Sequence, residues 1–405
     1  MKSLIVASFF AGGLALFAES VPEKPAIVDS RVLILKERVT LAAVEAAMTK
    51  GVDFLVGKQN ADGSFGTARR TKELNIYAPL PGAQDAYLAG TSGLAISGLI
   101  DADDSRPEVK AAIEKAEKWA FAKLPELRRA DATTTYNAWG HAYGLRAISR
   151  LYQSAAGDAT RQAALKALAQ QQAGLADRYE YLNGGWGYLH VFEELHTQKP
   201  TGITTSFTTA SVLLAMHEAR ETMGITLDPK IVETSLASIR RQQFPDFTYA
   251  YSHSHRMFPQ NEINRRNGSL GRSQACNATL RAFGDPKITD AVLTMWADNF
   301  VEFEHWLDHG RKKPVPHEST FKIAGYFYYY GIYYFTVSAQ YLPKGKQSEL
   351  ARSLAQILLT RQEKDGSWWD YPLYDYGQAY GTGYALMSLK WCREAMRDGA
   401  SPSSQ

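Results

Sequence analysis

The sequence predicts an all-α protein, an α/α toroid in which about six helical hairpins form an inner and an outer ring of helices. The chain alternates six times between an amphipathic segment and a segment rich in small and aromatic residues. No long stretch alternates with the period of a β-strand, and no linker divides the repeats. The spacing between repeats wanders between about 50 and 70 residues, which favours a closed ring over an open solenoid.

The first helix of each hairpin is expected in the outer ring, because apolar residues recur at helical spacing with charges between them. In the last of these helices Leu350, Leu354, Ile357 and Leu358 form the apolar stripe. The outer helices are expected over residues 40–58, 108–123, 161–172, 229–243, 286–303 and 348–362.

The second helix of each hairpin is expected in the inner ring. It has small and apolar residues on most faces, as Gly381, Gly383 and Ala385 illustrate in the last one, which is typical of a helix surrounded by others. The inner helices are expected over residues 86–100, 133–152, 204–222, 270–283, 319–341 and 377–396.

The two ends of the chain differ from the repeats. Residues 1–20 have the order of a secretory signal: Lys2, the apolar stretch 4–17 and a small-x-small site at 18–20. We therefore expect export to the periplasm or the medium, with a lead-in over 21–39, the toroid over 40–397 and a disordered tail over 398–405.

Composition excludes several classes of function. With 45% hydrophobic and 12% aromatic residues the chain can bury a large core. A net charge of +3 without a long basic run predicts no nucleic-acid partner, and no later segment approaches the roughly 20 apolar residues of a membrane span. Cys276 and Cys392 are too few for a disulfide framework, so helix packing must hold the fold.

Two turns between outer and inner helices share the pattern Gln-x-x-x-Gly-x-aromatic, at residues 59–65 and 362–368, and Gly184-Gly185-Trp186 is a partial copy. The pattern resembles the Gln–Trp repeat of squalene and oxidosqualene cyclases and the related repeat of protein prenyltransferase β subunits. The resemblance covers about residues 46–396. It implies an exported single-toroid member of the terpenoid cyclase and prenyltransferase superfamily, with a central aromatic cavity for an isoprenoid.

The catalytic residues of that superfamily do not carry over. Asp101-Ala102-Asp103-Asp104 matches the letters of the cyclase acid motif, but it follows an inner helix and precedes Pro107. We therefore expect a solvated turn that caps the next helix. Gly381 stands where the prenyltransferases have a zinc-binding histidine. We expect neither a metal nor a cofactor.

A functional site is expected at one end of the ring, where all loops from outer to inner helices must lie. Basic loop residues and the amides of the inner helix starts favour an anionic ligand there, such as an isoprenoid diphosphate or a uronate. The candidate proton-transfer groups by position are Asp85, Glu318 and Asp375, with Glu262 as a further acid. The candidate ligand-binding residues are a cation, two loop histidines and aromatic side chains: Arg272, His253, His255, Tyr251, Tyr330, Trp186, Trp368, Tyr376 and Tyr380.

Three functions fit these observations. The first is an enzyme or binding protein for a small apolar or anionic ligand, an isoprenoid above all. The second is a polysaccharide lyase or hydrolase, since such enzymes also use α/α toroids, and the third is a binding or scaffolding toroid without catalysis. A deep apolar pocket lined by Tyr and Trp would favour the first, an open cleft with paired carboxylates or Arg the second, and a filled centre the third.

Overall fold

The structure, a computed structural model, describes residues 39–69, 83–127, 138–187, 191–192 and 201–399. The predicted signal at 1–20, nearly all of the lead-in and the tail from residue 400 lie outside this part of the chain. From Val39 onward the chain forms one compact unit. None of the helices in the described residues is both long enough and apolar enough to span a membrane.

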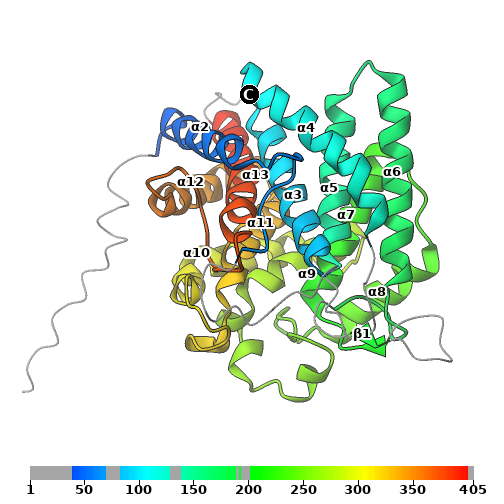
Figure 1. The fold of residues 1–405 in the computed structure, drawn as a ribbon. Coiled ribbons are helices and arrows are strands. Elements are labelled where there is room, and N and C mark those ends of the chain that lie inside the picture. The colour runs from blue at the N-terminus through cyan, green and yellow to red at the C-terminus, as the bar shows by residue number, and fades with distance from the viewer. Residues whose placement is uncertain (1–38, 70–82, 128–137, 188–190, 193–200, 400–405) are drawn as a thin grey trace, which may run out of the picture. The chain divides into compact units, whose positions relative to one another are not determined.

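Twelve α-helices of the described residues form two rings, as the sequence predicts. The inner helices are α3 (Ala83–Ala102), α5 (Trp139–Ser154), α7 (Ser206–Met223), α9 (Leu270–Ala282), α11 (Tyr328–Ala339) and α13 (Gly377–Asp398). Each of these contacts the next, and α13 contacts α3, so the inner ring is closed. Figure 1 shows the red α13 beside the cyan α3, although the two stand at opposite ends of the chain.

The outer helices pack against this ring with one apolar side. They are α2 (Leu41–Lys58), α4 (Pro107–Lys123), α6 (Ala159–Arg178), α8 (Pro229–Arg241), α10 (Asp290–Gly310) and α12 (Lys344–Arg361). Four of them begin after a residue whose side chain accepts a hydrogen bond from the first turn, namely Thr40, Asp158, Asp228 and Thr289. Pro107 begins α4, where a missing N–H has no cost.

Short elements complete the described residues. Strands β1 (Val191–Phe192) and β2 (Thr201–Gly202) form one antiparallel pair. The 3-10 helices lie in the connections: η1 (Leu124–Glu126), η2 (Ser254–Met257), η3 (Glu262–Asn264), η4 (Arg266–Ser269), η5 (Thr320–Lys322) and η6 (Gly325–Phe327).

The repeated glutamine joins each turn to the neighbouring hairpin. The Gln59 amide donates to the carbonyl of Gly63 at 3.1 Å and to that of Ala112 in α4 at 2.8 Å. Gln362 likewise donates to Gly366 and, at 2.9 Å, to Ala47 in α2, the first described helix. The last turn thus joins α12 to α2 by the same kind of hydrogen bond that joins α2 to α4 at the first turn. This bond closes the outer ring.

The aromatic residue of the pattern holds the turn on its own outer helix. Trp368 is fully buried, and its indole N–H donates to the carbonyl of Leu358 in α12 at 2.9 Å. Trp186 is also fully buried and donates to Ala176 in α6 at 2.9 Å. These two tryptophans, expected among the ligand-binding residues, therefore have a packing role in the turns.

Glycine permits the close approach of α3 and α13. A Cβ on Gly98 would lie 2.9 Å from the Cα of Gly383, and a Cβ on Gly383 would lie 2.4 Å from the carbonyl oxygen of Leu94. Real Cβ atoms do not tolerate such distances, so the inner ring closes only with small residues at this contact.

Several expectations need correction. The fifth inner helix, expected over 319–341, begins only at Tyr328, because Phe321 and Lys322 have left-handed backbones with φ of 60° and 53° that an α-helix cannot contain. The third outer helix runs to Arg178, beyond the expected end at 172, and the fifth runs to Gly310, beyond the expected end at 303. The acid-rich turn is not wholly solvated, because Asp101 is buried and accepts from Arg150 at 3.0 Å and Lys390 at 3.2 Å.

Candidate functional site

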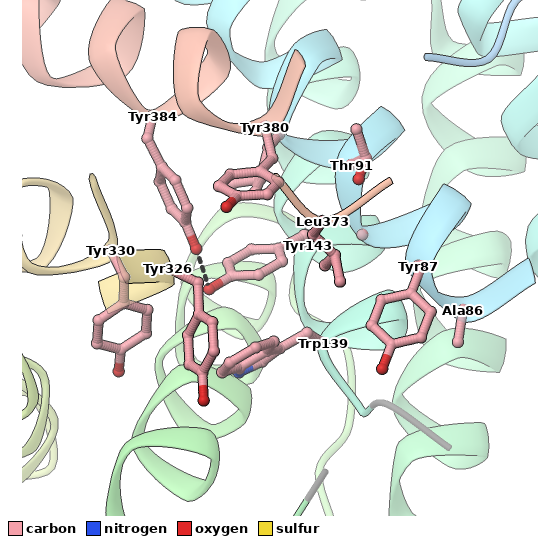
Figure 2. A pocket seen from close by; sticks show the side chains of 12 residues that line it. Ala86, Tyr87, Thr91, Trp139, Tyr143, Tyr326, Tyr330, Leu373, Tyr380 and Tyr384 are labelled. Atoms are coloured by element: carbon pink, nitrogen blue, oxygen red, sulfur yellow. Dashed lines mark hydrogen bonds between the residues drawn. The ribbon is translucent and has the colours of Figure 1, made fainter. Parts of the chain in front are cut away.

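A cavity of about 80 Å³ lies among the N-terminal halves of the inner helices α3, α5, α11 and α13. Figure 2 shows aromatic side chains converging on it from several elements. None of the lining residues is charged: Ala86, Tyr87, Gly90, Thr91, Leu94, Trp139, Tyr143, Tyr326, Tyr330, Leu373, Tyr380 and Tyr384. The cavity is therefore mostly apolar, with polarity supplied by hydroxyl groups.

Tyrosines also hold the inner ring together around the cavity. The hydroxyl of Tyr384 donates a hydrogen bond to the hydroxyl of Tyr143, with the two rings edge to face (Figure 2). The Tyr330 hydroxyl donates to the carbonyl of Phe207 in α7 at 3.0 Å. Burial raises the pKa of each of these phenols, so all three remain neutral hydroxyls at neutral pH.

Charged groups occupy the opposite end of the inner ring. The buried Arg146 donates to the Tyr333 hydroxyl and pairs with Glu218 at 2.7 Å. Glu218 also pairs with Arg150 at 2.6 Å, and Arg150 pairs with Asp101. This network leads away from the cavity toward the ends of α3, α5 and α7, so these charges do not face a ligand in it.

A second group of side chains, which we call the rim cluster, adjoins the cavity at Tyr326. It consists of Tyr251, His255, Arg272, His317 and Tyr326. The Tyr251 ring lies 5.3 Å from that of His255 and 5.6 Å from that of His317, measured between centroids. The Tyr326 hydroxyl lies 3.5 Å from Nε2 of His317, and Tyr326 also lines the cavity.

The two histidines of the rim cluster are neutral at neutral pH. Burial lowers the pKa of both, and the positive charge of Arg272 adds to this. Nδ1 of His317 lies 2.6 Å from the carbonyl of Lys322, to which it donates, so Nε2 is the acceptor that faces the Tyr326 hydroxyl. Nδ1 of His255 lies 2.8 Å from the Ser252 hydroxyl.

Arg272, the expected ligand-binding cation, holds the loop before α9. Its Nε donates to the carbonyl of Tyr249 at 2.9 Å, and an NH2 group donates to the carbonyl of Ile263. Burial lowers the pKa of Arg272 to about 10, so the guanidinium stays charged at neutral pH. Because no cation is among the residues that line the cavity, the cavity offers an anion no counter-charge.

The three predicted acids lie outside the cavity. Asp85 and Asp375 both raise the pKa of Tyr376 by their negative charge, although burial is the larger cause. Asp375 pairs with Arg69 at 3.3 Å and accepts from the Thr67 hydroxyl at 3.2 Å. Glu318 is exposed.

The predicted ligand-binding residues divide into separate places. Tyr330 and Tyr380 line the cavity, while Tyr251, His255 and Arg272 belong to the rim cluster. Tyr376 is buried and stacks on Tyr87 with ring centroids 6.1 Å apart. His253 is half-buried, and its Nδ1 has no hydrogen-bond partner among the described residues.

The sequence interpretation missed Asp370, a fully buried acid next to the cavity. The Tyr380 hydroxyl, on a residue that lines the cavity, meets Oδ1 of Asp370 at 2.6 Å. The available signal was its position between Trp369 and Tyr371, since tryptophan is largely buried on average and Tyr is intermediate.

The two cysteines belong neither to the cavity lining nor to the rim cluster. Cys276 and Cys392 are both buried free thiols. Within the described ranges no group of three His, Cys, Asp or Glu side chains could hold a metal ion.

Solved structures share the fold of this chain. A cellobiose 2-epimerase from Spirochaeta thermophila is 15% identical with a TM-score of 0.55, and the match covers 88% of this chain and 97% of the epimerase. A family 76 glycoside hydrolase from a bovine Bacteroides thetaiotaomicron strain is 10% identical with a TM-score of 0.50, covering 90% of this chain and 79% of that one. The type II terpene cyclase MstE from Scytonema is 14% identical with a TM-score of 0.48, covering 88% and 100%.

No family model and no curated protein matches the sequence. At these identities the structural matches establish the fold. The predicted α/α toroid is confirmed, and the matches with TM-scores of 0.55 and 0.50 are the cellobiose 2-epimerase and the glycoside hydrolase.

Proposed function

We propose that the protein is a terpenoid-cyclase-like toroid that binds one isoprenoid unit, or an unsaturated ring of similar size, in its central cavity. The observation that carries this proposal is the lining, which combines aromatic faces with aliphatic side chains and contains no charged group. The polar groups of the described lining residues are hydroxyls and the Trp139 indole, and no carboxylate, amide or cationic side chain is present among them to orient a polar ligand such as a sugar.

The cavity volume limits the size of the bound group. A dry protein cavity of about 150 Å³ binds benzene. The volume of about 80 Å³ found here accommodates a group of a few carbon atoms. A longer isoprenoid would therefore insert only its end, and the rest would remain outside the cavity.

The aromatic faces suit an electron-poor or cationic centre. Trp139 lies against Tyr143 and Tyr330, with ring centroids 6.5 and 6.2 Å apart, so three rings border one volume. The face of an aromatic ring attracts positive charge, most strongly when water is excluded. A carbocation formed from a bound alkene would be stabilised there.

Binding can be measured with farnesol as the probe. Trp139→Ala removes the largest ring of the lining, and we expect farnesol affinity to fall by about tenfold or more. Trp306→Ala is the matched control, because Trp306 lies on the outer helix α10 and is not among the lining residues. Calorimetric titration of both variants, after circular dichroism has shown that they are folded, decides the point. Equal affinity in the two variants would contradict the proposal.

A carbohydrate ligand is the second candidate, and the rim cluster favours it. Two neutral histidines, whose rings both lie near that of Tyr251, could exchange protons with a sugar that stacks on the tyrosine. Proton NMR of cellobiose, and reducing-end release from polysaccharides, test this function. Turnover of either, with no farnesol binding and no lipid detected by native mass spectrometry, would replace the first proposal. Binding of neither class would favour a scaffolding role.

We also propose that the protein is exported, on the basis of residues 1–20. Fractionation of expressing cells, with N-terminal sequencing of the mature chain, tests this. A chain that keeps Met1 and stays in the cytoplasm would contradict it.

A further inference from the structure

Asp370 is a buried carboxyl group directly behind the wall of the cavity. It lies in the connection between α12 and α13 and has no exposed surface. Its Oδ1 meets the Tyr380 hydroxyl at 2.6 Å, and its Oδ2 accepts the backbone N–H of Tyr329 at 3.0 Å. The side chain of Tyr380 lines the cavity and separates it from the carboxyl group of Asp370.

The surroundings of Asp370 favour the neutral carboxyl. A buried carboxylate is costly unless a cation or several donors compensate it. No Lys or Arg of the described residues forms an ion pair with Asp370, although its backbone carbonyl accepts from the N–H of Lys312. Burial raises the pKa of Asp370 to about 7, and the bonds from Tyr380 and Tyr329, together with the positive charge of Arg311, oppose that rise only in part. The group can thus hold or release a proton near neutral pH.

The two oxygens of Asp370 have different roles. Oδ2 is committed as an acceptor, because a backbone N–H can only donate. The proton of the neutral carboxyl group therefore lies on Oδ1 and is donated to the Tyr380 oxygen. The hydroxyl proton of Tyr380 then points away from Asp370. When Asp370 is ionised, the same 2.6 Å contact runs in the opposite direction, from Tyr380 to Asp370.

We propose that Asp370 and Tyr380 form a proton relay that exchanges one proton with the group bound in the central cavity. In the forward step the Tyr380 O–H bond breaks as its proton passes to the ligand, and the Oδ1–H bond of Asp370 breaks as its proton restores Tyr380. Asp370 is left as a carboxylate, and the ligand has gained one proton without oxidation or reduction. The reverse step returns the proton when the ligand loses one.

This relay rests on the proposed function, because it needs a ligand in the cavity that can accept a proton. The competing role for Asp370 is structural, since its Oδ2 also satisfies an N–H at the start of α11. Asp370→Asn keeps an acceptor for that N–H but has no acid proton, so it separates the two roles.

Infrared difference spectroscopy of the ligand-free protein tests the relay through the C=O band of a protonated carboxyl group. We expect a band that disappears as the pH rises through about 7 and that is absent in Asp370→Asn. In Tyr380→Phe the midpoint should rise by about one pH unit, because a bond that stabilises the carboxylate is gone. Tyr384→Phe is the matched control: it also removes a cavity phenol, but one bonded to Tyr143, and the midpoint should not move.

The outcomes are distinguishable. The absence of a band that titrates near neutral pH, or the same titration in Asp370→Asn, would overturn the relay. A midpoint that Tyr380→Phe leaves in place would assign Asp370 a structural role and also overturn it. Adding farnesol to the wild type should raise the midpoint, because a bound apolar group excludes water; an intact titration that farnesol does not affect would contradict the proposed ligand and leave the relay in place.

Discussion

The Tyr384 hydroxyl on α13 donates a hydrogen bond to the Tyr143 hydroxyl on α5, joining two inner helices across α3. Both side chains are buried, and both line the cavity (Figure 2). This hydrogen bond thus joins helices of the inner ring, and the two residues that form it are also part of the cavity wall.

Removing one of these hydroxyls should cost more stability than removing both. Tyr143→Phe leaves the Tyr384 hydroxyl buried without this partner, and we expect the free energy of unfolding to fall by about 1–2 kcal/mol. The double variant with Tyr384→Phe should recover part of the loss. Urea denaturation of the four proteins measures this coupling, and strictly additive losses would contradict it.

Gln362→Ala should loosen the closure of the outer ring. It removes the bonds to Ala47 in α2 and to Gly366 in the turn, so we expect a loss of about 1–3 kcal/mol. Gln356→Ala, in the helix α12 that ends just before Gln362, is the control and should change stability by less than about 0.5 kcal/mol. If thermal and urea unfolding show similar losses for both, the closing bond has no special weight.

Gly383→Ala should destabilise the contact between α3 and α13. The added Cβ would meet the Leu94 carbonyl oxygen, which is backbone and cannot rotate away, so we expect a loss of about 1–3 kcal/mol. Gly57→Ala, in helix α2 with no atom within 4 Å of the new Cβ, should instead stabilise by about 0.5–1 kcal/mol. Urea midpoints that move in the same direction would be inconsistent with this packing.

His141 should make the protein less stable in mild acid. Burial lowers its pKa to about 4, while the pKa of a histidine in the unfolded chain is near 6.5, so the unfolded chain binds the proton more readily. The free energy of unfolding therefore keeps its full value above about pH 6.5. It falls by up to about 3 kcal/mol as the pH decreases toward 4.

His141→Gln checks the origin of this pH dependence. The ring nitrogen Nδ1 of His141 donates to Gln172 at 2.9 Å, and an amide can replace that donor without titrating. Urea unfolding from pH 4 to 7 should show a flatter profile in this variant. His309→Gln, at an exposed position, should keep the wild-type slope. An unchanged slope in His141→Gln would assign the acid sensitivity to other groups.

Sequence periodicity predicted the hairpins well, because an outer helix must alternate apolar and charged residues whatever its neighbours are. The glutamine and glycine of the turns carried further information, since their bonds at Gln59 and Gln362 are local and repeat. The start of α11 was not predicted, because the residues around Phe321 gave no signal against a helix, whereas Phe321 and Lys322 have left-handed backbones.

The candidate site was predicted only in part. Tyr330 and Tyr380 were identified from their inner helices, but the burial of Asp370 depends on the packing of the last two hairpins, which brings the starts of α11 and α13 together. Arg272 was expected to face a ligand, whereas the fold directs its donors to two loop carbonyls. Neither the net charge nor the position of a residue in the sequence shows which side-chain donors will bind backbone carbonyls.

The bond from Gln362 to Ala47 has a consequence for the order of folding. It connects residues that are 315 positions apart, and α13 must be present before α3 has both of its inner neighbours. Contacts so distant in sequence form slowly, because a long loop must first close. During synthesis the ring therefore stays open until the last hairpin has left the ribosome. A truncation that removes this hairpin should abolish the native state as a whole, and the remaining five hairpins would not form a smaller ring.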